Sequence, residues 1–309
     1  MGFRAEMLEK VIHLLHLLDT LRAHPFLRGR WALKGGTALN LFLFDVPRLS
    51  VDIDLNYVGS LGREQMTAER PKIEQALRAV FAREGFSVIR APAEHAGGRW
   101  ARRYQSALGQ GGNLEVDLNY LFRMPLWEPS VTDSRPVASF QASSIPLLDI
   151  HELAAGKLAA LLARNAVRDL YDAHQMLTRF PLERERLRIA FVVYGAINRR
   201  DWRTVSADDV KATPAEVRAQ LMPTLRRGAL AGTEHLEAWV ERLVAECREG
   251  LLAVLPLRDA ERAFLDRLLD QGEVDPLLLT RDEALAERLR RHPALEWKAL
   301  NVRQFKTRR

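Results

Sequence analysis

Two short runs decide the fold of this chain: KGGTALN at residues 34–40 and SVDIDLN at residues 50–56. The first run is a glycine turn that opens an apolar helix, and such a turn presents backbone N–H groups and the positive end of a helix dipole to an anion. In the second run, apolar residues alternate with Asp52, Asp54 and Asn56, so these three polar side chains share one face of a strand. The two runs therefore predict a phosphate cradle that leads into an acidic strand.

The two aspartates of this strand indicate a metal site. Asp52 and Asp54 are two residues apart, so their carboxylates point the same way and repel each other unless a cation offsets their charge. Mg²⁺ prefers hard oxygen ligands and is commonly held by one or two carboxylates together with substrate phosphates. The alternative interpretation is a buried hairpin whose acidic face is simply solvated.

Six residues around these runs are candidates for phosphate contact: Lys34, Gly35, Gly36, Thr37, Arg48 and Ser50. The two glycines let the backbone approach a ligand closely or adopt a positive φ. Thr37 could cap the following helix or contact a phosphate, and Lys34 could reach a triphosphate or stay solvated. Arg48 could bind phosphate, for which a guanidinium is well suited, or pair with a carboxylate. Ser50 could orient Asp52 through a hydrogen bond.

The order of these features resembles a known superfamily. A phosphate cradle followed by a D-h-D strand, where h is apolar, is the plan of the nucleotidyltransferase fold. Within that superfamily, KGGTALNLF followed by RLSVDIDL resembles the AbiEii/AbiGii toxin family, the nucleotidyltransferase halves of bacterial abortive-infection and toxin–antitoxin systems. The resemblance implies an α+β protein, in which an N-terminal nucleotidyltransferase-fold domain with a mixed sheet flanked by helices precedes an all-helical C-terminal domain.

A second acidic strand resembles the motif that completes the metal site in this superfamily. In NLEVDLNY at residues 113–120, Glu115, Asp117 and Asn119 share one face. By the resemblance Asp117 is the third acid, and it precedes the letters LNY just as Asp54 does. Such an acid would bind metal and help to deprotonate the attacking hydroxyl. Glu115 is the alternative.

The domain boundary is predicted near residue 146. A chain of 309 residues should hold about two domains. Residues 125–146 are rich in loop signals and contain four prolines. We therefore expect a catalytic domain over residues 1–146 and a helical domain over residues 147–309, where apolar residues recur at helical spacing.

A second family signature lies at the start of the predicted helical domain. KLAALLAR at residues 157–164 and VRDLYD at residues 167–172 resemble it. By that resemblance Lys157 reaches into the active-site cleft and contacts the nucleotide phosphates, and Asp169 or Asp172 supports Lys157, Arg164 or the nucleotide. The alternative is an ion-pair network on the surface of two helices.

Charge and composition limit which classes of partner the protein can have. The formal net charge of +6 modestly favours a polyanionic partner, although arginine-rich usage alone would give the same balance. Arg99, Arg102 and Arg103 make the strand predicted over residues 100–107 basic, so it could touch acceptor RNA or the nucleotide. No apolar run has membrane-spanning length and Cys247 is the single cysteine, so we expect a cytoplasmic protein without membrane contact or disulfide framework.

Together these features predict Mg²⁺-dependent nucleotidyl transfer with release of pyrophosphate. Asp52, Asp54 and Asp117 would hold one or two Mg²⁺ ions, for which Mn²⁺ could substitute, and Lys157 would neutralise charge on the triphosphate. The family resemblance implies an NTP donor, the 3′ end of tRNA as acceptor, a block of translation, and a cognate antitoxin. A protein or small-molecule acceptor, or a catalytically inactive RNA- or antitoxin-binding module, are the alternatives.

Overall fold

The computed structural model describes residues 2–90, 97–109, 111–228 and 235–307. The chain divides into two compact units, Met1–Leu148 with Pro223–Ala229, and Asp149–Met222 with Leu230–Arg309. The predicted fold class is confirmed, because the first unit is built on a mixed β-sheet flanked by helices and the second is helical throughout its described residues. No helix in the described part of the chain is long and apolar enough to cross a membrane.

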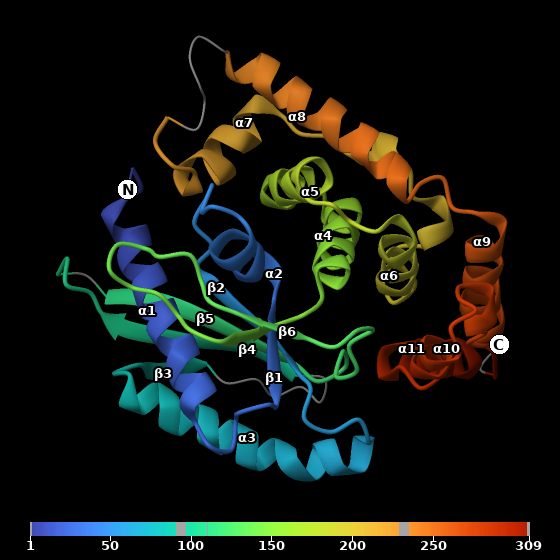
Figure 1. The fold of residues 1–309 in the computed structure, drawn as a ribbon, viewed down its shortest axis with the longest axis horizontal. Helices are drawn as coiled ribbons and strands as arrows, with labels where there is room; N and C mark the ends of the chain where they lie inside the picture. The colour runs from blue at the N-terminus through green and yellow to red at the C-terminus, as the bar shows by residue number, and fades with distance from the viewer. Residues whose placement is uncertain (1, 91–96, 110, 229–234, 308–309) are drawn as a thin grey trace. The chain divides into compact units, whose positions relative to one another are not determined.

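The sheet of the first unit has seven strands among the described residues, in the order β3-β4-β5-β2-β1-β7-β6 (Figure 1). Their bounds are β1 Trp31–Lys34, β2 Asp52–Tyr57, β3 Ser87–Arg90, β4 Gly97–Gln105, β5 Gly111–Asn119, β6 Ser130–Thr132 and β7 Ile145–Leu147. The central strand β2 pairs antiparallel with β1 and parallel with β5, and β5 pairs antiparallel with β4. Both signature strands, β2 and β5, are therefore direct neighbours.

Two helices, α1 (Ala5–Ala23) and α3 (Arg63–Arg83), pack on one face of this sheet (Figure 1). His13 of α1 contacts the ring of Tyr104 on β4, and Phe81 of α3 contacts Trp100 of the same strand. The apolar residues of the alternating strands point to these helices. The alternation consequently places the polar residues of β2 and β5 on the opposite face.

The glycine turn follows β1 directly. The α2 helix (Gly35–Ala38) begins at the first glycine, and it continues into one π-helical turn, η1 (Leu39–Leu43). The apolar helix predicted after the glycine turn is present, and its first residue, Gly35, has a φ of +74°. That left-handed conformation lets the chain leave the strand and enter the helix within one residue.

The second unit is formed by helices connected through short turns. The longer ones are α4 Ile150–Arg164, α5 Val167–Arg179, α6 Arg184–Ala196, α8 Leu236–Gly250, α9 Asp259–Asp266, α10 Glu283–Arg290 and α11 Pro293–Thr307. Asp149 caps α4 by accepting a hydrogen bond from the backbone N–H of His151. Asn165 ends α4 in the left-handed region, with a φ of 51°. This tight corner sets α5 directly against α4.

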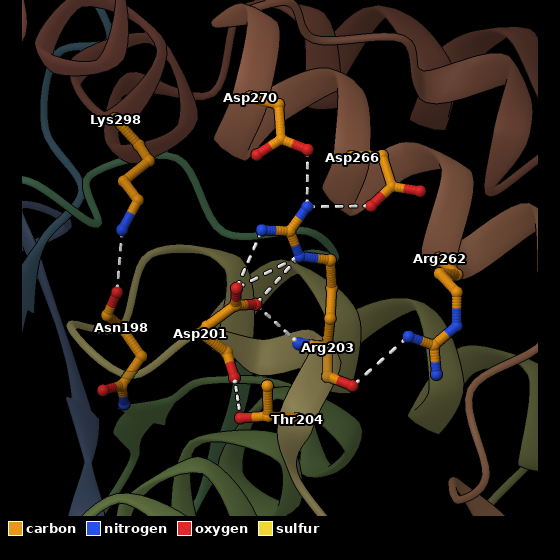
Figure 2. Close-up of polar contacts among 8 residues, drawn as sticks. All are labelled: Asn198, Asp201, Arg203, Thr204, Arg262, Asp266, Asp270 and Lys298. Atoms are coloured by element: carbon orange, nitrogen blue, oxygen red, sulfur yellow. Dashed lines mark hydrogen bonds and ion pairs between the residues drawn. The ribbon is translucent and has the colours of Figure 1, made fainter.

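A charged network ties two parts of this helical unit together (Figure 2). The guanidinium of Arg203 donates to Asp201 on its own turn, and to Asp266 at 2.9 Å and Asp270 at 2.6 Å. Lys298 of α11 donates to the carbonyl oxygen of Asn198 at 2.8 Å. Because these carboxylates are about half exposed, the network should add little to stability.

Candidate active site

One row of charged residues crosses four strands of the first unit. Lys34 on β1 is the Cα partner of Asp54 on β2, Asp54 is the partner of Asp117 on β5, and Asp117 is the partner of Arg99 on β4. Directly paired residues carry their side chains on the same face of a sheet. The row therefore reads cation, acid, acid, cation, on the face opposite α1 and α3.

A second pair of acids lies one step along the same strands. Asp52 is the Cα partner of Glu115, so four carboxylates occupy two neighbouring levels of β2 and β5. Glu115 is bonded to Arg99, whose Nη1 lies 2.9 Å from its Oε2. Of the two acids on β5, Glu115 thus has a cationic partner, and Asp117 lies beside Asp54. This arrangement favours Asp117 as the third acid, which stays a prediction.

The pKa of the Asp117 carboxyl reflects its burial and the charges around it. Burial raises the pKa of the Asp117 carboxyl, the charge of Lys34 opposes that rise, and the charge of Asp54 adds to it. Neighbouring carboxylates are unfavourable unless a positive charge is shared between them. A divalent cation would supply that charge.

The donor set suits a hard divalent cation that arrives with a substrate. Asp52, Asp54 and Asp117 offer only carboxylate oxygens, the ligands that Mg²⁺ prefers. No group of three histidine, cysteine or acidic side chains in the described residues is arranged to hold a metal by itself. The three aspartates are therefore not gathered around one point in this structure, and their joint binding of a metal stays a prediction.

The glycine turn lies directly against the acids. A methyl group built on Gly35 would overlap the carboxylate of Asp54, and one on Gly36 would lie 2.9 Å from both Arg48 Nη2 and Ser50 Oγ. The turn therefore brings its backbone to the acidic row, and no larger residue fits at either position without displacing these side chains.

The hydroxyl of Thr37 fixes the turn to the acidic strand. Its Oγ1 donates to the carbonyl oxygen of Asp52 at 2.5 Å, and the side chain is fully buried. Of the two alternatives for this hydroxyl, the helix cap is not formed, because α2 has no side-chain cap and the hydroxyl bonds to β2 instead. Thr37 therefore acts here by positioning Asp52. Its contact with phosphate stays a prediction.

Sequence reasoning missed Asn40, which holds the other end of the turn. Its Nδ2 donates to the carbonyl oxygen of Gly36 at 2.9 Å, and the residue is fully buried. The available signal was a single amide inside an otherwise apolar helical run, which a core position rarely carries without a bonding role.

Arg48 and Ser50 are both buried beside the turn. Arg48 is 3% exposed, its Nη1 donates to the carbonyl oxygen of Leu49 at 3.1 Å, and its backbone forms an isolated bridge with Leu225. The backbone N–H of Leu49 donates to Thr224. A segment far along the chain thus supports the arginine, and its contact with phosphate stays a prediction.

The family signature at residues 157–172 forms a buried ion cluster within the helical unit. Lys157 Nζ lies 2.9 Å from Asp169 Oδ1 and 3.0 Å from Asp172 Oδ2, and Arg164 Nε lies 2.6 Å from Asp169 Oδ2. Burial alone would raise the pKa of Asp169, but the attached ammonium and guanidinium hold it below its ordinary value. The alternative of a surface network does not describe this cluster, because only Arg164 is exposed.

Comparison with known proteins agrees with this arrangement. The chain is similar in fold to a solved structure, MenT4, nucleotidyltransferase toxin Rv2826c from Mycobacterium tuberculosis H37Rv, with a TM-score of 0.55, 16% sequence identity and 95% of each chain covered. No curated protein matches the chain at a significant level. The sequence model described as "Nucleotidyl transferase AbiEii toxin, Type IV TA system" matches residues 16–305. Because that match spans nearly the whole chain, the protein belongs to the AbiEii family of nucleotidyltransferase toxins from type IV toxin–antitoxin systems.

Proposed function

We propose that this toxin transfers a nucleoside monophosphate from an NTP to the 3′ end of tRNA, in a Mg²⁺-dependent reaction that blocks translation. The observation that supports it best is the row of Lys34, Asp54, Asp117 and Arg99 beside the glycine turn. It combines a place for phosphates, carboxylates for a metal, and a cation on either side. The family implies an NTP donor and a cognate antitoxin as partners.

The acids would hold the metal while the turn receives the triphosphate. Asp52, Asp54 and Asp117 are the proposed ligands, and bound Mg²⁺ would polarise the α-phosphate and lower the pKa of the acceptor hydroxyl. Gly35 and Gly36 leave the backbone free to approach phosphate oxygens. Lys34, at the end of β1, would neutralise charge on the leaving pyrophosphate.

Asp117 is the proposed proton acceptor. The acceptor oxygen forms a bond to the α-phosphorus, the bond from that phosphorus to the pyrophosphate oxygen breaks, and the hydroxyl proton moves to the carboxylate. Asp117 is chosen for this step because it pairs with Asp54 in the acidic row and lies on the side towards Arg99. The Lys157 cluster stays, by family resemblance, a prediction of phosphate contact.

The test is incubation of the purified chain with total tRNA, Mg²⁺ and each α-³²P-labelled NTP in turn. Asp54→Asn is the active-site variant, and Asp45→Asn is the matched control, because Asp45 is an exposed aspartate of the same unit. Label should appear on tRNA with the wild type and the control, and vanish with Asp54→Asn or EDTA. Label on a protein or small molecule in place of tRNA would contradict the proposed acceptor. Equal labelling by Asp54→Asn would contradict the proposed site.

A further inference from the structure

Arg99 is a cation of the acidic row that the reaction above leaves without a role. It is the Cα partner of Asp117, its side chain is 63% exposed, and its guanidinium is bonded to the partly exposed Glu115. Ion pairs this exposed contribute little to stability. The arrangement is therefore poorly explained as a stabilising contact.

The position of Arg99 in the row places it on the side of the acids that lies away from the glycine turn. Lys34 and the glycine turn lie on the β1 side of Asp54, whereas Arg99 lies on the opposite side, beyond Asp117. Neighbouring strands are about 4.8 Å apart, so the Cα of Arg99 lies about 10 Å from that of Asp54. In phosphoryl-type transfer the attacking and leaving oxygens are roughly in line. With the pyrophosphate leaving towards the glycine turn, the acceptor enters from the side of Arg99.

The other arginines of β4 show which side chains can serve this purpose. Arg102 points to the opposite face, where its guanidinium lies 3.5 Å from the ring centroid of Phe81 and is fully buried. Arg102 therefore adds no charge to the surface of this strand, and contact of the strand with RNA or nucleotide stays a prediction. Arg103 is exposed and, four residues from Arg99, shares its face. The basic strand thus presents two arginines to the acidic face, and one of them adjoins the acids.

We propose that Arg99 is the acceptor-side anchor of this toxin, and that it exchanges Glu115 for a backbone phosphate next to the terminal hydroxyl of an RNA. This inference rests on the proposed function. A guanidinium binds phosphate through two parallel hydrogen bonds, a stronger contact than an exposed ion pair. Glu115 holds the arginine near the acids and competes with the RNA for it.

The experiment measures RNA binding and transfer separately on the full-length chain. Binding of ³²P-labelled total tRNA is followed by filter binding over a series of salt concentrations, and transfer gives separate KM values for tRNA and NTP. Arg99→Ala is compared with Arg83→Ala, which removes an exposed arginine of α3 on the other side of the sheet. Arg99→Ala should weaken tRNA binding about tenfold, as expected for one charge-assisted contact. It should also lower the salt slope by about one and leave the KM for NTP unchanged.

Glu115→Gln tests the exchange itself. It should tighten tRNA binding about threefold in the wild-type background, and this gain should disappear in the Arg99→Ala background, because the two residues act on the same phosphate contact. A gain that persists without Arg99 would overturn the exchange.

The outcomes separate this inference from the proposed function. Equal tRNA affinities and salt slopes for Arg99→Ala and Arg83→Ala would overturn the inference, even while label still reaches tRNA. An absence of tRNA binding by the wild type would overturn it as well. If tRNA binding depends on Arg99 and no label is transferred, the proposed function is wrong, whereas the contact of Arg99 with an RNA phosphate is supported.

Discussion

Replacement of Gly35 by alanine should inactivate the enzyme through a collision with Asp54, and a matched variant can separate this collision from backbone strain. Gly35 has a φ of +74°, and an alanine forced into that region costs about 1–2 kcal/mol of folding free energy. The added methyl group would also overlap the carboxylate of Asp54. A displacement of about 1 Å at a catalytic group can lower a rate about 100-fold. The variant should therefore lose both stability and activity.

Gly29→Ala provides the control. Gly29 has nearly the same φ, +72°, but nothing lies within 4 Å of the position of its Cβ. It shares the backbone strain with Gly35→Ala and lacks the collision. Gly29→Ala should lose about 1–2 kcal/mol in the free energy of unfolding, measured by urea titration, and Gly35→Ala should lose at least as much.

The two variants should differ in transfer of labelled nucleotide to tRNA. Gly29→Ala should retain wild-type activity, whereas Gly35→Ala should lose about two orders of magnitude in kcat. Equal activity of the two variants would refute the argument that the glycine turn lies against a catalytic carboxylate. A large loss of activity in Gly29→Ala would show that backbone strain alone accounts for the effect.

Three further predictions concern the acids, the turn and the helical unit. Asp117→Asn should abolish transfer yet unfold at higher urea than the wild type at pH 7 with EDTA present. The reason is that the pKa of Asp117 is raised in the folded state, so the wild-type protein loses free energy of unfolding as pH rises through that pKa. The unfolding free energies of the two proteins should therefore become equal at a pH below the ordinary pKa of a carboxyl group. Thr37→Val should cost about 1 kcal/mol of unfolding free energy, because it removes the buried hydrogen bond to Asp52, and Thr37→Ser should restore most of it. Arg203→Ala should cost at most about 1 kcal/mol, with a smaller difference in 1 M salt, since its carboxylate partners are about half exposed. Arg203 lowers the pKa of Asp201, so this contribution should be present at neutral pH and fall as pH drops through the lowered pKa.

The kinds of residue at the candidate site could be predicted because they follow from local rules. Alternation along a strand places Asp52 and Asp54 on one face whatever the rest of the chain does. A double glycine between a strand and an apolar helix likewise predicts a close backbone approach. The family signatures then indicated what chemistry such residues carry.

Contacts between distant segments could not be predicted in the same way. Nothing in the sequence near Arg48 shows that Leu225 pairs with its backbone, or that Thr224 accepts the hydrogen bond from Leu49. The role of Thr37 depended on the same kind of information, since its hydroxyl bonds to a strand that follows the helix. Such pairings are set by tertiary packing, which overrides the local preference for a helix cap.

The register of β2 against β5 determines which acid lies where. The letters DLN recur at residues 54–56 in β2 and 117–119 in β5, and the structure pairs the copies with no offset, so that Asp54 lies opposite Asp117. A slip of one residue would reverse the face of every side chain on β5 and move both of its acids to the helix side. A slip of two would set Glu115 opposite Asp54 and Asp117 opposite Asn56. The apolar alternation excludes the first slip but permits the second, which keeps all side chains on their faces. The charged row across four strands therefore depends on tertiary register, and so does the argument that the acceptor enters from the side of Arg99.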